Sequence, residues 1–206
     1  MKYADFTLGQ VEAVFNKIGG ASAVNAFLRG ELEVKPVEKP ARIEFTVQGT
    51  GLTAAAWIST IESAGHKIGD WARDILSKPD YDAKHRLEAG KEYKIVLVRG
   101  KEIARDSDRT TKNLKAVAIK EFGKSSVSDL KGELALLTRM KFSNAELEQM
   151  GLWYIAVLHE PIIDSDGDPC VLCSRRGGAG LSWVGAGFGR PDYNWHGGGA
   201  FAFLAE

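Results

Sequence analysis

Residues 171–205 read VLCSRRGGAGLSWVGAGFGRPDYNWHGGGAFAFLA, and their composition differs from that of the preceding chain. The segment holds nine glycines and no Lys, Glu, Gln, Met, Ile or Thr. Its aromatic residues are Trp183, Phe188, Tyr193, Trp195, Phe201 and Phe203. So much glycine argues against a long helix, and so many aromatic side chains argue against an unstructured tail. We therefore expect short strands at about residues 170–174, 181–188 and 200–204, joined by tight loops and anchored in a core by Trp and Phe.

The composition of the whole chain sets limits on its class. A length of 206 residues is expected to form one domain, or one domain with an appendage, and can bury a core without disulfides or metal. The formal net charge is zero, so no global field draws the protein to nucleic acid or anionic lipid. The first ten residues lack the apolar segment of a signal peptide, and no run approaches a membrane span. We expect cytoplasmic synthesis and leave the destination open, with a virion or a surface among the candidates.

The first 89 residues are expected to form an N-terminal helical and α+β segment, either separate or part of the same core. Apolar spacing predicts helices at residues 8–18 and 22–28, and a Pro-containing linker follows at 34–40. The helical pair resembles a helix-turn-helix, but its second helix offers only Arg29 to DNA, so an ordinary helical hairpin is favoured.

The rest of this segment is expected to contain one strand, two helices and a loop. Alternating apolar residues predict a strand at 42–48. Helices should follow at 53–64 and 70–77, and the polar tract 78–89 is expected to be a loop. His66 and His85 are expected to stand alone in polar surroundings.

Residues 90–206 are expected to form the main domain. A strand is predicted at 92–99, a helix from about 106–108 to 122, and a second helix from Ser128 through Met140. Ser143 and Glu146 match a capping box that opens a short helix. Residues 153–159 are apolar on both alternating faces, which predicts a central strand ending at a core-edge histidine, His159.

This order of elements is α+β, and over residues 89–206 it resembles the C-type lectin fold. In that fold a first strand leads into two helices, irregular loops and strands follow, and the last strand returns to pair near the first. The formylglycine-generating enzymes share the fold and use a cysteine pair, but their cysteine spacing differs from that of Cys170 and Cys173. The resemblance implies a C-type-lectin-like domain that carries extra N-terminal helices.

An acidic turn and a cysteine pair are the candidates for metal or redox chemistry. Asp164, Asp166 and Asp168 match the start of a calcium loop, but Pro169 stands at the required glycine and Arg175 at the bidentate glutamate. A tight turn that caps its own backbone amides explains the same spacing. Sugar-binding C-type lectins hold calcium with Glu-Pro-Asn or Gln-Pro-Asp and with Trp-Asn-Asp motifs, which this chain lacks.

The Cys170-x-x-Cys173 pair supplies two of the four ligands that a closed zinc site needs, and His159 and His196 would have to supply the others. A redox pair needs a helix N-terminus beside it, which a strand does not provide. We expect no catalytic residue, metal or cofactor. The alternative that stays open is a metal- or cysteine-dependent enzyme that uses the turn at 164–168 with Cys170 and Cys173.

The residue types between Ser174 and Gly199 share one property at the level of codons. Apart from Trp, all of them are encoded by codons that end in a pyrimidine, a set that cannot encode Lys, Glu, Gln, Met or Trp. The segment therefore resembles the variable region, here about residues 171–199, of a variable protein of a diversity-generating retroelement. In those systems an error-prone reverse transcriptase randomises adenines in a template, and the varied residues lie at the C-terminal end of a C-type lectin fold.

This resemblance implies a division between scaffold and displayed residues. Trp183 and Trp195 would be invariant, because a TGG codon contains no adenine. Residues 199–203 resemble the Gly-Phe-Arg strand that closes such variable regions, without its arginine. A biased composition can also arise in an ordinary Gly-rich β-region, and that alternative stays open.

The function expected from these observations is binding of a variable ligand, a protein or a cell-surface molecule, without catalysis. Tyr, Ser, Gly and Asn are favoured in antibody paratopes, and Arg and Tyr are typical interface hot spots. The expected ligand-binding residues are Ser174, Arg175, Arg176, Ser182, Gly185, Gly187, Phe188, Gly189, Asp192, Tyr193, Asn194 and His196.

Overall fold

The computed structural model describes residues 7–33, 42–177 and 180–205, and the chain divides into two compact units. The units are residues 1–41 and 42–206, so the division does not fall at the expected position between residues 89 and 90. Strand β1 (Glu44–Gln48) pairs along its whole length with β3 (Glu92–Arg99), which places the segment after residue 41 in the main core. The linker expected at 34–40 lies outside the described residues.

The N-terminal unit is a pair of helices, α1 (Leu8–Lys17) and α2 (Gly20–Leu28). Thr7 caps α1 in a capping box with Gln10, whose side chain accepts a hydrogen bond from the Thr7 amide at 2.8 Å. Gly19 has a left-handed φ of 107° and precedes α2, so this helix begins at Gly20 and not at Ser22 as expected. Neither helix buries a residue.

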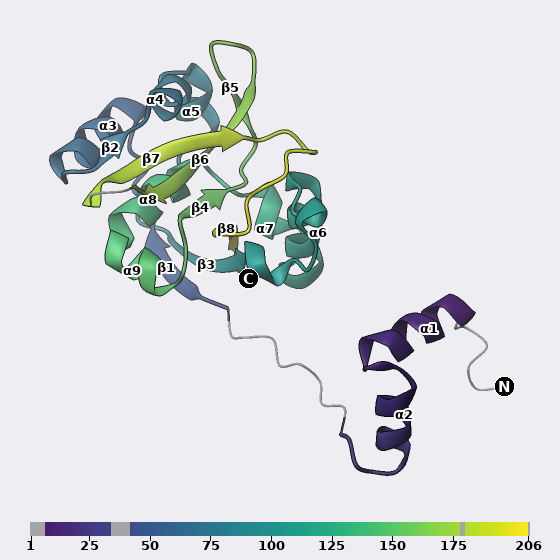
Figure 1. The fold of residues 1–206 in the computed structure, drawn as a ribbon. Helices are drawn as coiled ribbons and strands as arrows, with labels where there is room; N and C mark the ends of the chain where they lie inside the picture. Colours follow the sequence, from purple (N-terminus) through teal and green to yellow (C-terminus); the bar gives the residue numbers. More distant parts are fainter. Residues whose placement is uncertain (1–6, 34–41, 178–179, 206) are drawn as a thin grey trace. The chain divides into compact units, whose positions relative to one another are not determined.

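The second unit is built on an eight-stranded mixed sheet (Figure 1). Its strand order is β1-β3-β8-β4-β6-β7-β2, and β5 pairs with β6. The remaining strands are β2 (Lys67–Ile68), β4 (Tyr154–Val157), β5 (Ile162–Ile163), β6 (Pro169–Arg176), β7 (Ser182–Phe188) and β8 (Gly199–Leu204). Pairing is antiparallel except between β4 and β8 and between β2 and β7. The predicted strands are confirmed, including the central position of β4, whereas β2 and β5 were not predicted.

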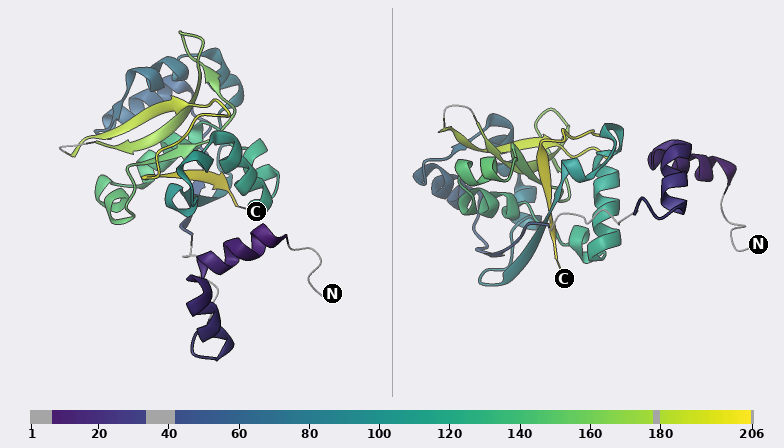
Figure 2. Two further views of the ribbon diagram at one scale, coloured as in Figure 1. Left: turned by 45° about the vertical axis from the view of Figure 1, so that its right-hand side comes forward. Right: turned by 60° about the horizontal axis from the view of Figure 1, so that its bottom comes forward.

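Helices pack against this sheet in three groups (Figures 1 and 2). The helices of this unit are α3 (Ala54–Ser63), α4 (Asp70–Leu76), α5 (Pro79–Lys84), α6 (Thr111–Phe122), α7 (Ser125–Ser128), α8 (Glu133–Lys141) and α9 (Asn144–Gln149). Helix α8 contacts the central strands β4, β6 and β7, while α3 and α4 contact β2 and β7 respectively. Helices α6 and α7 contact β8. The class of fold is therefore α+β with a mixed sheet.

Two predicted segments differ from the structure for local reasons. The tract 78–89 was predicted as a loop, but it contains α5, because Pro79 occupies the first turn of that helix and Tyr81 is fully buried. The helix expected from Ser128 through Met140 starts later than predicted, because α7 ends at Ser128 and α8 begins at Glu133, with Gly132 as its N-cap. The Ser143 capping box is confirmed, since its hydroxyl accepts from the Glu146 amide and Glu146 accepts from the Ser143 amide.

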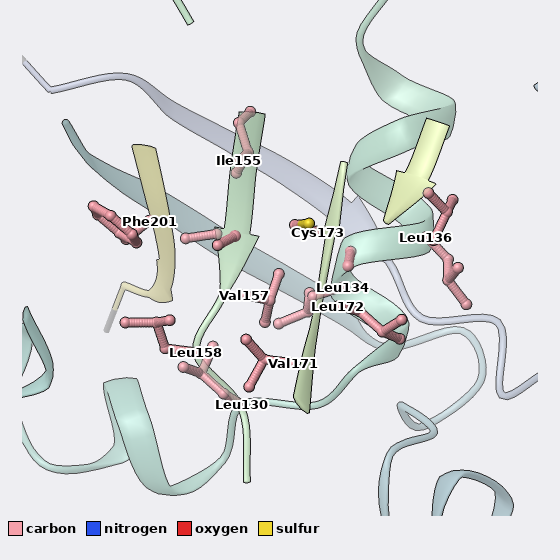
Figure 3. Packing of buried hydrophobic residues seen from close by; sticks show 14 of the residues in the cluster. Leu130, Leu134, Leu136, Ile155, Val157, Leu158, Val171, Leu172, Cys173 and Phe201 are labelled. Carbon is pink, nitrogen blue, oxygen red and sulfur yellow. The ribbon is translucent and has the colours of Figure 1, made fainter. Parts of the chain in front are cut away.

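The core lies between the sheet and α8. Figure 3 shows Val157 and Leu172, from β4 and β6, packed with Leu134 of α8. Glu133, at the start of α8, is fully buried, and its carboxylate accepts four hydrogen bonds from Thr50, Gly51 and Leu87. These bonds tie the turn after β1 and the segment before β3 to α8. No described helix combines the length and the apolar character needed to cross a bilayer.

Candidate binding surface

The candidate site starts from one row of residues that crosses adjacent strands of the sheet. Tyr154 of β4 is the cross-strand partner of Arg175 on β6, which is in turn the partner of Trp183 on β7. Paired residues project from the same face of a sheet, so the side chains of Tyr154, Arg175 and Trp183 lie on one face. The row continues to Gly199 of β8 and Lys67 of β2, whose ammonium lies 5.4 Å from the Trp183 ring centroid.

Beside this row, the same face of the sheet carries small residues. The next cross-strand pair on the same face is Cys173 with Gly185, and Gly187 follows on β7. A Cβ atom on Gly185 would lie 3.0 Å from Cδ and Nε of Arg175, so the Arg175 side chain lies over this glycine. A Cβ atom on Gly187 would lie 2.8 Å from Cη2 of Trp195. The absence of side chains at these glycines therefore makes room for Arg175 and Trp195.

The loop between β7 and β8 supplies the aromatic wall. Trp195 is 4% exposed, and its indole N–H donates to Thr111 Oγ1 at 2.9 Å. Its ring centroid lies 4.9 Å from that of Tyr193 and 5.9 Å from that of Tyr154. The Arg109 guanidinium donates to the Trp195 carbonyl at 3.1 Å. These contacts hold Trp195 in place as a wall between the loop and the sheet.

Two adjoining hollows result, and they share Arg175 and Arg176. The first, called here the Arg175 hollow, has a volume of about 540 Å³ and is lined by Trp153, Tyr154, Arg175, Arg176, Tyr193, Trp195 and His196. The second, called here the β7 groove, has a volume of about 400 Å³ and is lined by Gly69, Asp70, Trp71, Ala72, Arg175, Arg176, Trp183, Val184, Gly185 and Ala186. Aromatic side chains and arginine dominate the lining of the Arg175 hollow, and the β7 groove adds Trp71 and Trp183 beside the same two arginines, which suits recognition of another molecule.

The two arginines differ in their partners. Arg176 lies over the Trp153 ring at 3.9 Å, donates to the Leu152 carbonyl and pairs with Glu148 at 2.9 Å. Arg175 donates from Nε to Cys173 Sγ at 3.1 Å and from Nη2 to the Ala186 carbonyl at 2.8 Å. Neither of those acceptors is a carboxylate. The charge of Arg176 is therefore neutralised by Glu148, whereas Arg175 has no carboxylate partner among the residues that the structure describes.

The structure divides the twelve expected ligand-binding residues into groups. Arg175, Arg176, Tyr193 and His196 line the Arg175 hollow. Gly185 lines the β7 groove, Gly187 lies against the Trp195 ring, and both are buried. Phe188 is half-buried and contacts Trp71 and Tyr193 edge to face.

The other five expected residues, like Gly185, Gly187 and Phe188, are not part of the lining of the Arg175 hollow. Asp192 and Asn194 are exposed on the loop after β7. Ser182 lies 2.6 Å from Nδ1 of His66. The expectation for Ser174 is wrong, because this residue is buried on the opposite face and donates to the Ala135 carbonyl of α8 at 2.8 Å. Gly189 is buried and packs closely on Pro161, where an added Cβ would lie 2.8 Å from Cγ of the proline.

Two carboxylates of the acidic turn have partners in the folded chain: Asp164 caps the turn itself, and Asp168 pairs with Arg190. Asp164 accepts hydrogen bonds from the amides of Asp166 and Asp168, at 3.0 and 2.8 Å. Burial raises the pKa of the Cys170 thiol to about 12, and burial also raises the pKa of the Cys173 thiol. Residues three apart on a strand face opposite sides, so the two cysteines do not converge. Within residues 7–33, 42–177 and 180–205, no group of three or more His, Cys, Asp or Glu is placed to hold a metal ion.

The histidines form an unexpected buried pair. His85 was expected in polar surroundings, but it is 2% exposed and lies 4.7 Å, centroid to centroid, from His159. The prediction that His159 is a satisfied core histidine is confirmed, since its Nε2 accepts from the Leu172 amide and its Nδ1 contacts the Glu160 carbonyl. Burial lowers the pKa of His85 to about 4 and that of His159 to about 3.

Sequence reasoning missed the site residues that lie outside the C-terminal segment. Trp71, Trp153 and Tyr154 line the two hollows, yet they come from α4 and from the start of β4. Trp71 and Trp153 are 46% and 52% exposed, which is unusual for tryptophan and is a signal of a binding surface in a structure. The sequence offered no such signal, because exposure depends on the packing of other segments.

Comparison with known proteins gives no match: no protein-family model fits the chain, and no curated protein or solved structure matches it significantly.

Proposed function

We propose that this protein is a non-enzymatic, ligand-binding protein whose C-terminal surface is diversified by retroelement mutagenesis. One observation carries the proposal. The segment whose residue types fit pyrimidine-ended codons contributes Arg175, Arg176, Tyr193 and His196 to one hollow. A segment that varied at these positions would change the chemistry of a single surface.

The order and pairing of the strands support a C-type-lectin-like domain. Strand β3 is followed by helices α6 and α8, then by β4, β6 and β7, and the last strand β8 returns to pair antiparallel with β3. This is the sequence of elements that the C-type lectin resemblance implies. The variable region of a retroelement protein would then occupy β6, β7 and the loop that leads to β8.

A division between fixed and varied side chains also supports the proposal. Trp195 is buried, hydrogen-bonded to Thr111 and packed on Tyr193, so it serves as scaffold. Asp192, Asn194 and His196 lie beside it on the same loop and are exposed. Exposed loop residues tolerate substitution with little loss of stability, whereas a buried tryptophan does not. This alternation of buried and exposed positions suits a site that changes its ligand while keeping its fold.

The experiment that tests the proposal is a comparison of this locus among closely related isolates. We expect substitutions to concentrate at Arg175, Arg176, Tyr193, Asn194 and His196, at codons that contain adenine in the template copy. Residues 114–140, which form helices and core, provide the internal control. If residues 174–196 vary no more than this control region, the proposal of diversification is wrong.

A second measurement tests binding separately from diversification. Exchange of exposed loop residues, such as Asn194 and His196, is expected to change which targets the protein captures while its free energy of unfolding changes by less than about 0.5 kcal/mol. Equal thermal destabilisation by every such exchange would show that the loop serves the fold and not a ligand.

A further inference from the structure

Arg175 carries a positive charge that no carboxylate of the described chain neutralises. Its hydrogen bonds go to a sulfur atom and a peptide carbonyl, and no ion pair within 4 Å involves it among the described residues. Its Nη1 atom has no hydrogen-bond partner in this part of the chain. Asp70 lines the neighbouring β7 groove but forms no such pair with Arg175.

The surroundings add to the positive potential at this point. Arg139 is fully buried behind β6 and donates to the Arg175 carbonyl at 3.0 Å, to the Asn144 side chain and to the Phe142 carbonyl. None of these acceptors is charged. The chain as a whole has no net charge, so this potential is local to the end of β6. An anion that enters the Arg175 hollow would meet an arginine with free donors and no competing carboxylate in its lining.

The lining also indicates which chemical group should lie next to the anion in a ligand. Tyr154, Tyr193 and Trp195 line the same hollow as Arg175, and Trp153 lies against Arg176 in that lining. A guanidinium beside aromatic faces binds a carboxylate in a bidentate manner while apolar groups pack on the rings. A ligand with a negative charge and an apolar side chain next to each other matches both features.

We propose that the Arg175 hollow binds an acidic side chain, Asp or Glu, of a protein partner, with an adjacent aromatic or aliphatic side chain packed on the half-buried rings of Tyr154 and Tyr193. A protein is favoured over a nucleic acid because phosphate backbones are bound by several free cations, whereas the other arginine of this hollow, Arg176, is already paired with Glu148. The inference concerns the surface of the proposed function but does not depend on its diversification. It applies to the side chains present in the sequence described here.

Two blocked dipeptides of the same shape are suitable probes: N-acetyl-Phe-Asp-amide and N-acetyl-Phe-Asn-amide. They differ in charge and not in size, so their affinities isolate the contribution of the carboxylate. We expect the Asp peptide to bind the full chain with a Kd of about 1–10 mM, and the Asn peptide to bind at least about tenfold more weakly. Tryptophan indole signals in NMR spectra would report the binding.

The variant Arg175→Gln is expected to abolish the difference between the two peptides. Arg190→Gln is the control, because Arg190 is an exposed arginine that lies over the Phe188 ring, pairs with Asp168 and is not part of the lining of the hollow. This control should retain the preference of the unaltered protein. If Arg175→Gln does not fold, Gly185→Ala provides a second variant that displaces the Arg175 side chain and should also lose the preference.

Several outcomes would overturn the inference. Equal binding of the two peptides, no binding of either, or a preference that survives both Arg175→Gln and Gly185→Ala would each do so. Inorganic phosphate serves as a third probe, and tighter binding of phosphate than of the Asp peptide would indicate a phosphate-bearing partner instead. The isolate comparison described above is independent of these measurements, so failure of one proposal can be told apart from failure of the other.

Discussion

The side chain of Arg175 crosses β7 directly above Gly185, where a Cβ atom would lie 3.0 Å from Cδ and Nε of the arginine. The glycine thus fixes the position of a charged group on the neighbouring strand. We expect Gly185→Ala to shift the flexible Arg175 side chain and to change the free energy of unfolding by less than about 1 kcal/mol. Urea denaturation measures the stability, and the dipeptide titration measures the loss of carboxylate preference. A larger loss in the free energy of unfolding would contradict the expectation that the Arg175 side chain can move aside.

Gly187→Ala is the matched substitution on the same strand, and its expected effect is different. The added Cβ would lie 2.8 Å from Trp195, which is buried and hydrogen-bonded and so cannot move aside easily. We expect a loss of about 1–3 kcal/mol in the free energy of unfolding, which urea denaturation would measure. Stability equal to that of Gly185→Ala would show that Trp195 is not a rigid part of the fold.

Glu133 is a fully buried carboxylate that accepts four hydrogen bonds and has no cationic partner among the described ion pairs. In Glu133→Gln the amide nitrogen would face a backbone N–H, either that of Leu87 or those of Thr50 and Gly51. We expect this variant to lose about 1–3 kcal/mol of unfolding free energy, because a buried donor is left without an acceptor. The exposed Glu148→Gln is the control for stability and should change it by less than about 0.5 kcal/mol. Similar losses in the two variants would contradict a structural role for the Glu133 carboxylate.

The buried pair of His85 and His159 predicts sensitivity to acid. Their pKa values in the folded state, about 4 and about 3, lie below the ordinary value of 6.5 because burial disfavours the charged form. As the pH falls below 6.5, the unfolded chain takes up protons that the folded chain does not. Above pH 6.5 the two histidines therefore do not lower the free energy of unfolding. As the pH falls from 6.5 toward 4, each histidine lowers the free energy of unfolding by about 1.4 kcal/mol per pH unit.

The measurement is urea denaturation at several pH values between 7.5 and 4.5. The variant His159→Gln should be less stable at neutral pH but should lose less stability per pH unit than the unaltered protein. His196→Gln, at an exposed position, should leave the slope unchanged. An unchanged slope in His159→Gln would show that this residue does not contribute to the acid sensitivity.

The division of the chain predicts that residues 42–206 fold without the N-terminal unit. All buried hydrophobic residues of the described chain lie between Val47 and Phe203, and neither α1 nor α2 buries a residue. We expect the shortened protein to unfold in one cooperative transition, with a Tm within about 3 °C of that of the full chain. Differential scanning calorimetry would show this, and a large fall in Tm would mean that the helices stabilise the main unit.

Much of the fold was predictable because its signals are local. The alternation at residues 42–48 and the apolar run at 92–99 predicted β1 and β3, and the Ser143 capping box marked the start of α9. The tract 78–89 was predicted wrongly as a loop because of its polar composition, whereas Pro79 opens α5 within it. The helix α5 is stabilised by the burial of Tyr81 and His85 in the core, and no local sequence pattern indicates that burial.

The candidate site was predictable only in part, and the reason is the same. Arg175, Tyr193 and His196 were predicted from the composition of their own segment, and they do line the hollow. Tyr154 and Trp153 were missed, because they reach the hollow through the pairing of β4 with β6 and β8.

The sequence alone therefore determined the six longer strands, β1, β3, β4, β6, β7 and β8, and the residue types that one surface can display, because period, capping and composition act over a few neighbouring residues. The tertiary structure alone decided which side chains meet. The register between β4 and β6 places Tyr154 beside Arg175, and the order of strands buries Ser174 while it exposes Arg175. Register and strand order depend on hydrogen bonds and packing between distant segments, and those interactions exist only once the chain has folded.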